Sequence, residues 1–165
     1  MTEAYADILK AGFKDDRIKA LLPMAPGNAS LVGENGLDNV DIPILLMTST
    51  LDRNNPNEVD GDPYWTAMKR DDALRVNYDK GGHHSYILTC ELSPVIAFEN
   101  GGGCEEANTD YRILLEATNV YSMAFVRYHL FGDQNMRPIL EGSAPTFEDV
   151  TVCLLYTSPS PRDRG

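Results

Sequence analysis

The sequence predicts an α/β fold in which short strands alternate with helices. Three compact apolar runs of strand length, at residues 17–26, 41–50 and 73–82, each end in residues that favour turns. A helical pattern at residues 62–72 separates the second run from the third, and a longer helical pattern follows at residues 109–131. Because strands that alternate with helices favour parallel pairing, we expect about three parallel strands with flanking helices.

The three strands differ in how clearly they are marked. The first, RIKALLPMAP at residues 17–26, contains Pro23, which cannot donate to a sheet ladder, so we expect that proline at the end of the strand. The second is DIPILLMTST at residues 41–50. The third, ALRVNYDKGG at residues 73–82, ends in a glycine pair that favours a turn.

Capping residues and the spacing of apolar residues predict two helices. In the helix at residues 62–72, Asp62 is the expected N-cap and Pro63 lies in the first turn. The helix at residues 109–131 is expected to be capped by Thr109 or Asn108 and to end at Gly132. Its apolar side chains recur every three or four residues and predict one face packed on the sheet: Leu114, Ala117, Tyr121, Ala124, Tyr128 and Phe131.

Charge and hydropathy exclude two classes of partner. The net charge of −11 repels nucleic acid phosphates and anionic lipid. No apolar run approaches the roughly 18 residues that a membrane helix needs, and the first residues do not have the pattern of a signal peptide. We therefore expect no nucleic-acid partner and no membrane span.

An acidic residue and a histidine follow successive strands. Asp52 comes directly after the strand at 41–50, and His83 follows the strand at 73–82, within the sequence KGGHHSY. Functional residues collect at the carboxyl ends of parallel strands, where a carboxylate can orient an imidazole and stabilise its protonated form. The spacing also occurs by chance in parallel-sheet proteins, so a catalytic pair and a polar turn both stay open at this point.

Longer segments resemble a known family. These are DIPILLMTSTLDRNNP at 41–56, KGGHHSYILTCELSP at 80–94, GGGC at 101–104 and LLEATNVYSMAFVRYHLFGD at 114–133. Together they resemble the C-terminal half of an α/β-hydrolase, closest to the bacterial predicted dienelactone hydrolases that are related to platelet-activating-factor acetylhydrolases. The resemblance spans residues 16–140 and implies an incomplete α/β-hydrolase sheet.

The resemblance implies roles for particular residues. The chain order in that family is serine, acid, histidine. Asp52 matches the acid of a Thr-Leu-Asp loop, and His83 matches the general base in a Gly-His-x-Ser-aromatic turn, whose other matching residues are Gly82, Ser85 and Tyr86. His84 stands where the family usually has an apolar or aromatic residue, so His84 remains the alternative base.

The nucleophile that the family requires does not occur in this sequence. No Gly-x-Ser-x-Gly motif is present, and Cys104 lies after the histidine without a closing glycine. We expect the nucleophile, the oxyanion hole and the first strands to lie upstream of Met1.

Residues 153–163 resemble a translated sequencing adapter of the kind that ends assembled environmental reads. We therefore expect a partial hydrolase domain at 1–152 and an adapter-derived tail at 153–165.

The two remaining cysteines and the histidines permit few other sites. The resemblance places a disulfide at positions matching Cys90 and Cys104 in exported members, whereas two free thiols would suit a cytoplasmic protein. Both pairing states stay open, and a periplasmic or secreted location is as consistent as a cytoplasmic one.

The sequence also lacks the patterns of common metal sites. A zinc site at His83, His84 and Cys90 lacks a well-spaced fourth ligand. The acidic loop at 52–62 misses the calcium-loop pattern. We expect neither metal nor cofactor.

These observations predict part of a serine ester hydrolase, similar to carboxylesterases and dienelactone hydrolases. The chain would supply the acid and histidine of a Ser-Asp-His triad for a small ester or lactone substrate, and would be inactive without the serine. The alternative is an α/β-hydrolase-fold protein that binds without catalysis. A nucleotide-binding domain is disfavoured because both glycine-rich phosphate motifs are missing.

Overall fold

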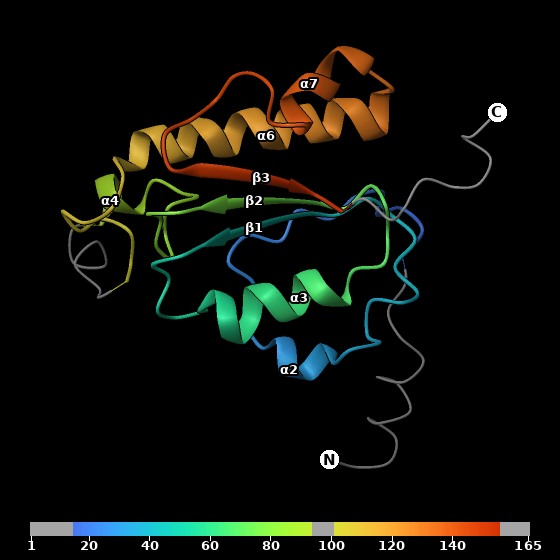
Figure 1. The fold of residues 1–165 in the computed structure, drawn as a ribbon, viewed down its shortest axis with the longest axis horizontal. Coiled ribbons are helices and arrows are strands. Elements are labelled where there is room, and N and C mark those ends of the chain that lie inside the picture. The colour runs from blue at the N-terminus through green and yellow to red at the C-terminus, as the bar shows by residue number, and fades with distance from the viewer. Residues whose placement is uncertain (1–14, 94–100, 156–165) are drawn as a thin grey trace.

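The computed structural model describes residues 15–93 and 101–155, which form three layers (Figure 1). A three-stranded sheet occupies the middle. Helices α6 (Tyr111–Phe131) and α7 (Arg137–Leu140) cover one face, and helices α2 (Ala29–Val32) and α3 (Asp62–Ala67) lie against the other (Figure 1). The fold is therefore of mixed α/β character, as the alternation of strand and helix patterns predicted.

The sheet has the order β1 (Leu45–Ser49), β2 (Leu74–Tyr78), β3 (Val150–Leu154). Strands β1 and β2 are parallel and lie within two of the predicted ranges. Strand β3 pairs antiparallel to β2, so the expectation of a purely parallel sheet was wrong. The chain enters β3 beside the end of β2, where Asp79 N donates to Asp149 O at 2.8 Å. The tail boundary expected after Val152 falls inside β3, which is why the sequence analysis did not find this strand.

The first predicted strand, at residues 17–26, is reduced to two isolated parallel bridges, Leu21 to Ile44 and Met24 to Met47. On this side of β1, Leu45 N donates to Leu21 O and Met47 N donates to Pro23 O, both at 2.9 Å. Pro23 thus lies in the middle of the paired segment and not at its end. Because proline has no N–H, one bond of the ladder is missing there, and a continuous strand does not form.

Helix α3 is shorter than predicted and begins differently. A π-helical turn, η1 (Asn57–Gly61), runs directly into α3, so Asp62 is the first residue of the helix and not its N-cap. Pro63 lies in the first turn, as expected. The helix ends at Ala67 because Met68 adopts an extended backbone and is buried in the small core formed with Ile44, Leu46 and Ala73.

Helix α6 is the longest element, and its ends are fixed by its neighbours. Asp110 caps the start by accepting a hydrogen bond from Arg112 N at 2.9 Å, so neither Thr109 nor Asn108 is the cap. The Thr109 hydroxyl instead donates to Asp149 in the segment that leads into β3. Gly132 ends the helix with a φ of +69°, as predicted, since glycine reaches this conformation without strain.

The main core lies between the sheet and α6. The alternate residues Leu45 and Met47 of β1 and Leu74, Val76 and Tyr78 of β2 face this helix. Four members of the predicted apolar face of α6 are buried, namely Leu114, Ala117, Tyr121 and Ala124. Phe125, which the predicted face did not include, is buried with them. Tyr128 packs at its margin. Phe131, the last member of the predicted stripe, is instead exposed.

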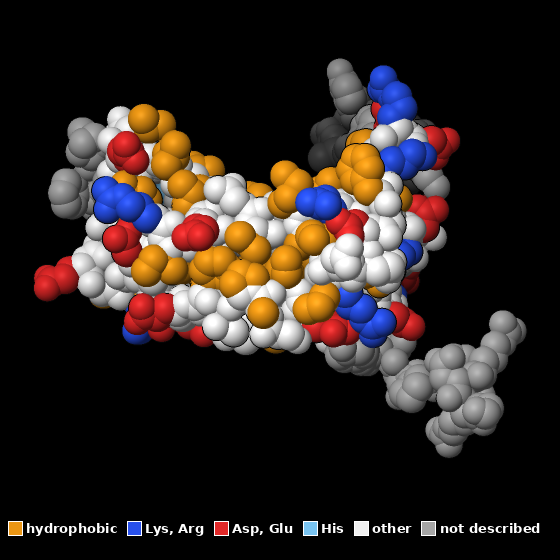
Figure 2. Space-filling model, turned by 90° about the horizontal axis from the view of Figure 1, so that it is seen from above, with side chains coloured by type: hydrophobic (Ala, Val, Ile, Leu, Met, Phe, Trp, Pro, Cys, Tyr) orange, Lys and Arg blue, Asp and Glu red, His pale blue; other side chains and the backbone are white. Residues whose placement is uncertain are grey.

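The outer surface on the α6 side also carries apolar side chains. Figure 2 shows hydrophobic side chains gathered in a band across this face, between charged groups of both signs. Met123, Leu130 and Phe131 are the large exposed apolar residues of α6. None of the helices in the described ranges is long and apolar enough to cross a membrane.

The contrast between two phenylalanines of α6 gives a test of the core. We expect Phe125→Ala to lower the free energy of unfolding by about 3–5 kcal/mol, because it leaves a cavity between helix and sheet. The same substitution at the exposed Phe131 should change it by less than about 0.5 kcal/mol. Urea denaturation followed by circular dichroism measures both. Equal effects at the two positions would contradict this packing.

Candidate active site

Asp52 lies at the carboxyl end of β1, in a loop that holds its carboxylate firmly. Its side chain is only 1% exposed. Oδ1 accepts hydrogen bonds from the backbone N–H groups of Asn54 and Asn55, both at 2.9 Å. The loop is tied to the neighbouring strand end because Leu51 N donates to Gly81 O at 3.0 Å. One carboxylate oxygen is therefore occupied by backbone donors, and the other is left for a partner.

That partner is His83. Its Nδ1 lies 3.0 Å from Asp52 Oδ2, although 31 residues separate the two in the sequence. The contact forms because β1 and β2 are parallel neighbours, so the loops that follow them leave the same edge of the sheet. The His83 side chain is 25% exposed, so the ring bridges the buried carboxylate and the surface.

The contact also determines the proton position on the ring. An ionised carboxylate only accepts hydrogen bonds, so the neutral His83 ring carries its proton on Nδ1 when it pairs with Asp52. Nε2 then has a free lone pair and can accept a proton from another group. This arrangement can act as a general base, and the buried carboxylate would stabilise the cation that forms.

His84 has a different environment. Its ring packs edge-on against that of His83, with 4.9 Å between ring centroids, and the residue is half-buried. The carboxylate of Asp52 is bonded to His83 and to two backbone amides. The structure thus brings Asp52 together with His83, and His84 lies beside the pair.

A turn of three glycines supports the histidines. His83 N donates to Gly101 O at 2.9 Å, and His84 N donates to Gly102 O at 2.7 Å. The two segments approach so closely that a side chain at Gly82 would overlap the backbone of Gly103. Gly101 and Gly103 have φ values of +85° and +104°, which favour glycine. The close approach and the turn both therefore need residues without side chains.

Glu105 closes this turn from its far side. Its carboxylate accepts hydrogen bonds from the N–H groups of Gly101, Gly103 and Cys104. Partial burial alone would raise the pKa of Glu105, but these backbone donors favour the charged form and hold the pKa below its usual value. Glu105 was not among the residues predicted from the sequence. The signal that could have indicated it is a carboxylate two residues after a glycine run, whose backbone amides are not covered by side chains.

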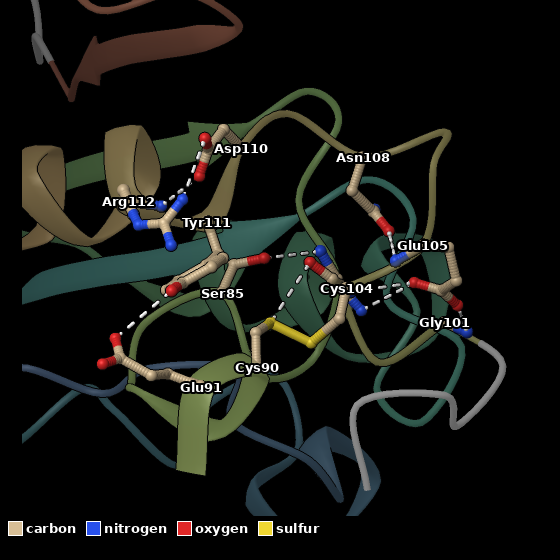
Figure 3. The surroundings of a disulfide bond; sticks show 12 residues. Ser85, Cys90, Glu91, Gly101, Cys104, Glu105, Asn108, Asp110, Tyr111 and Arg112 are labelled. Atoms are coloured by element: carbon tan, nitrogen blue, oxygen red, sulfur yellow. Dashed lines mark hydrogen bonds and ion pairs between the residues drawn. A yellow bond between two sulfur atoms is a disulfide. The ribbon is translucent and has the colours of Figure 1, made fainter. Parts of the chain in front are cut away.

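A disulfide bond joins Cys90 and Cys104, with 5.6 Å between their Cα atoms. Cys90 belongs to the short helix α4 (Thr89–Leu92), which follows the histidines, and Cys104 ends the glycine turn. Figure 3 shows the disulfide on one side of the turn and the Glu105 side chain on the other. The turn is therefore anchored twice, once covalently and once by hydrogen bonds.

The serines near this site are engaged elsewhere. Ser85 Oγ accepts from Gly82 N at 2.8 Å, and Ser49 Oγ is 2.6 Å from Tyr86 Oη. Both side chains are buried. Within residues 15–93 and 101–155, no serine hydroxyl donates a hydrogen bond to the His83 ring. In the described part of the chain, the carboxylate of Asp52 and the ring of His83 thus form a pair to which no serine hydroxyl is bonded.

No three His, Cys, Asp or Glu side chains among the described residues come together as metal ligands would. A groove of about 650 Å³ between α2 and α3 is lined by residues such as Ser30, Glu58 and Lys69. Neither Asp52 nor His83 lines this groove. The Asp52–His83 pair is therefore the arrangement with the clearest chemistry.

Comparison with known proteins does not place the chain in a family. No protein-family model matches the sequence, and no curated protein matches it either. The assignment of a function therefore depends on the geometry described above.

The disulfide should contribute to stability. Closing a loop of this length restricts the unfolded chain and stabilises the fold by about 3 kcal/mol in the chain-entropy description. We expect the double variant Cys90→Ala/Cys104→Ala to unfold at lower urea concentration, and reduction of the wild type to have a similar effect. The exposed Cys153, which is free, provides the control substitution Cys153→Ala. A double variant as stable as this control would argue against the bond.

Glu105 should make stability depend on pH in a defined direction. Because the pKa of Glu105 is lowered in the fold from its ordinary value of 4.5, the stabilisation is complete above that pH and is lost as the pH falls through the folded-state pKa. At pH 7 we expect Glu105→Gln to cost about 1–2 kcal/mol, from its hydrogen bonds. Urea titrations should show this difference shrinking in acid. Glu106→Gln, at an exposed neighbour, should show no such trend.

Proposed function

We propose that this chain supplies the acid and the general base of a serine ester hydrolase of the α/β-hydrolase type. The observation that carries the proposal is the contact of 3.0 Å between His83 Nδ1 and Asp52 Oδ2 at the carboxyl ends of parallel strands. The order of the two residues along the chain agrees with the serine, acid, histidine order of that class. Supporting observations are the burial of Asp52 and the partial exposure of His83.

In the proposed reaction, a serine on a segment N-terminal to this sequence attacks the carbonyl carbon of an ester or lactone. His83 Nε2 takes the proton of the serine hydroxyl, while Asp52 holds the ring and stabilises the imidazolium. The tetrahedral intermediate then collapses, and the leaving alkoxide receives the proton from His83. Water, activated by the same nitrogen, hydrolyses the acyl-enzyme and returns the serine. The same residues would also occur in a protein that kept the scaffold and lost catalysis.

The test is to recover the longer gene and read the residues before Met1. A strand followed by Gly-x-Ser-x-Gly supports the hydrolase, and an intact upstream half without that serine supports the binding protein. The 165-residue chain alone should not hydrolyse p-nitrophenyl esters above the rate of its own Asp52→Ala/His83→Ala variant, because it lacks the nucleophile. Turnover above that control would contradict the assignment.

In the longer protein, Asp52→Asn should reduce kcat by about 10⁴-fold, because an amide at this position stabilises the wrong tautomer of His83. His83→Ala should reduce it at least as much. The discriminating variant is His84→Ala, since it tests the alternative base. A large loss in kcat for His84→Ala together with near-normal kcat for His83→Ala would move the general base to His84.

A further inference from the structure

Glu105 is the side chain that links the glycine turn to the candidate base. Its carboxylate accepts from Gly101 N, Gly103 N at 2.9 Å and Cys104 N at 3.1 Å. The carbonyl of Gly101, in turn, accepts from His83 N at 2.9 Å. A single peptide residue, Gly101, therefore separates the carboxylate of Glu105 from the backbone of the histidine.

These hydrogen bonds continue through His83 to the acid. His83 Nδ1 bonds Asp52 Oδ2, and Asp52 Oδ1 is held by the amides of Asn54 and Asn55. The ring orientation thus has two determinants: the carboxylate that it contacts, and the backbone position from which it extends. Asp52 fixes the first, and the glycine turn fixes the second.

The conformation of the turn depends on Glu105 because three successive glycines do not fix their own backbone conformation. Two of its three glycines have positive φ values, and glycine loses more conformational freedom on folding than any other residue. The disulfide fixes the turn only at Cys104, its last residue. Glu105 reaches back to Gly101, the first residue of the turn and the one that His83 contacts. Figure 3 shows this side chain extending from beside Cys104 toward Gly101.

A second contact fixes Glu105 against the strand end that leads to the histidines. Glu105 N donates to Asn108 Oδ1 at 3.0 Å, and Asn108 Nδ2 donates to Lys80 O at 2.9 Å. Lys80 comes directly before the glycine pair that leads into His83. The segment 101–108 is thus attached to the histidine turn on both sides of Gly81 and Gly82.

We propose that Glu105 is a positioning residue for His83: by binding the amides of the glycine turn, it holds the imidazole in the orientation that pairs Nδ1 with Asp52. This proposal rests on the proposed role of the pair as acid and base. Glu105 does not contact the reacting atoms. Its effect is on the tautomer and orientation of the ring.

The experiment is nuclear magnetic resonance of the ¹⁵N-labelled chain, which reports directly which nitrogen of His83 carries the proton. The three histidine rings of the sequence are assigned with the His84→Gln and His129→Gln variants. In the wild type we expect His83 in the Nδ1–H form, with a low-field proton resonance from the hydrogen bond to Asp52. In Glu105→Gln, an NH2 group replaces one carboxylate oxygen and cannot accept from the backbone amides that this oxygen binds. The low-field resonance should therefore be lost, and the ring should shift to a mixture of tautomers.

Glu106→Gln removes the same charge from the adjacent exposed residue and should leave the His83 signals unchanged. Glu105→Asp is the second variant if Glu105→Gln does not fold; its shorter side chain cannot span from Cys104 to Gly101, so the low-field resonance should again be lost. A folded Glu105→Gln or Glu105→Asp chain with wild-type His83 signals would overturn the proposal.

The outcomes separate this inference from the proposed function. Unchanged His83 signals in the folded Glu105 variants remove the positioning role and leave the acid–base pair intact. An upstream half without a nucleophile would contradict the proposed hydrolase function. Loss of the His83 resonance in Glu105→Gln would still establish that Glu105 fixes the orientation of the His83 ring.

Discussion

The parallel pairing of β1 with β2 is the constraint on which the candidate site depends. It places the carboxyl ends of both strands at one edge of the sheet, so that the loops beginning at Thr50 and Asp79 run side by side. The backbone bond from Leu51 N to Gly81 O continues this alignment past the strands. The contact between Asp52 and His83 follows from this alignment and needs no further adjustment of the two loops. The buried core under α6 keeps the strands in register, because Leu45, Met47 and Val76 are fully enclosed there.

A charged side chain is usually costly to bury, and Asp52 is almost completely enclosed. The cost is offset by three donors: two backbone amides on one oxygen and the imidazole on the other. These donors hold the carboxylate with Oδ1 toward the two amides and Oδ2 toward the ring. Glu105 uses the same physical device at the glycine turn, where backbone amides again bind a carboxylate. Two buried or half-buried acids thus fix the two loops that meet at His83.

Several elements could be predicted because their causes are local. The apolar content of residues 45–49 and 74–78, the three- and four-residue spacing in α6 and the stop at Gly132 are all visible in short stretches of sequence. The prediction that Asp52 and His83 lie at neighbouring strand ends used only these strands and the geometry of parallel sheets. Other features depend on contacts between distant segments. Thr109 was a plausible helix cap from its position in the sequence, but its hydroxyl donates a hydrogen bond to Asp149, 40 residues away. Phe131 fitted the apolar stripe, but it is exposed at the last position of α6.

The sequence by itself determined the α/β character, the two parallel strands and the position of an acid and a histidine after them, since each of these follows from local pattern and strand-end geometry. Only the tertiary structure decided that the sheet is mixed, that Pro23 interrupts its edge, and that Glu105 and the Cys90–Cys104 bond hold the turn behind His83. The physical reason is the same in each case. Strand direction, ladder register and the partners of backbone amides are set by which distant segments come to lie side by side, and no local pattern encodes that choice.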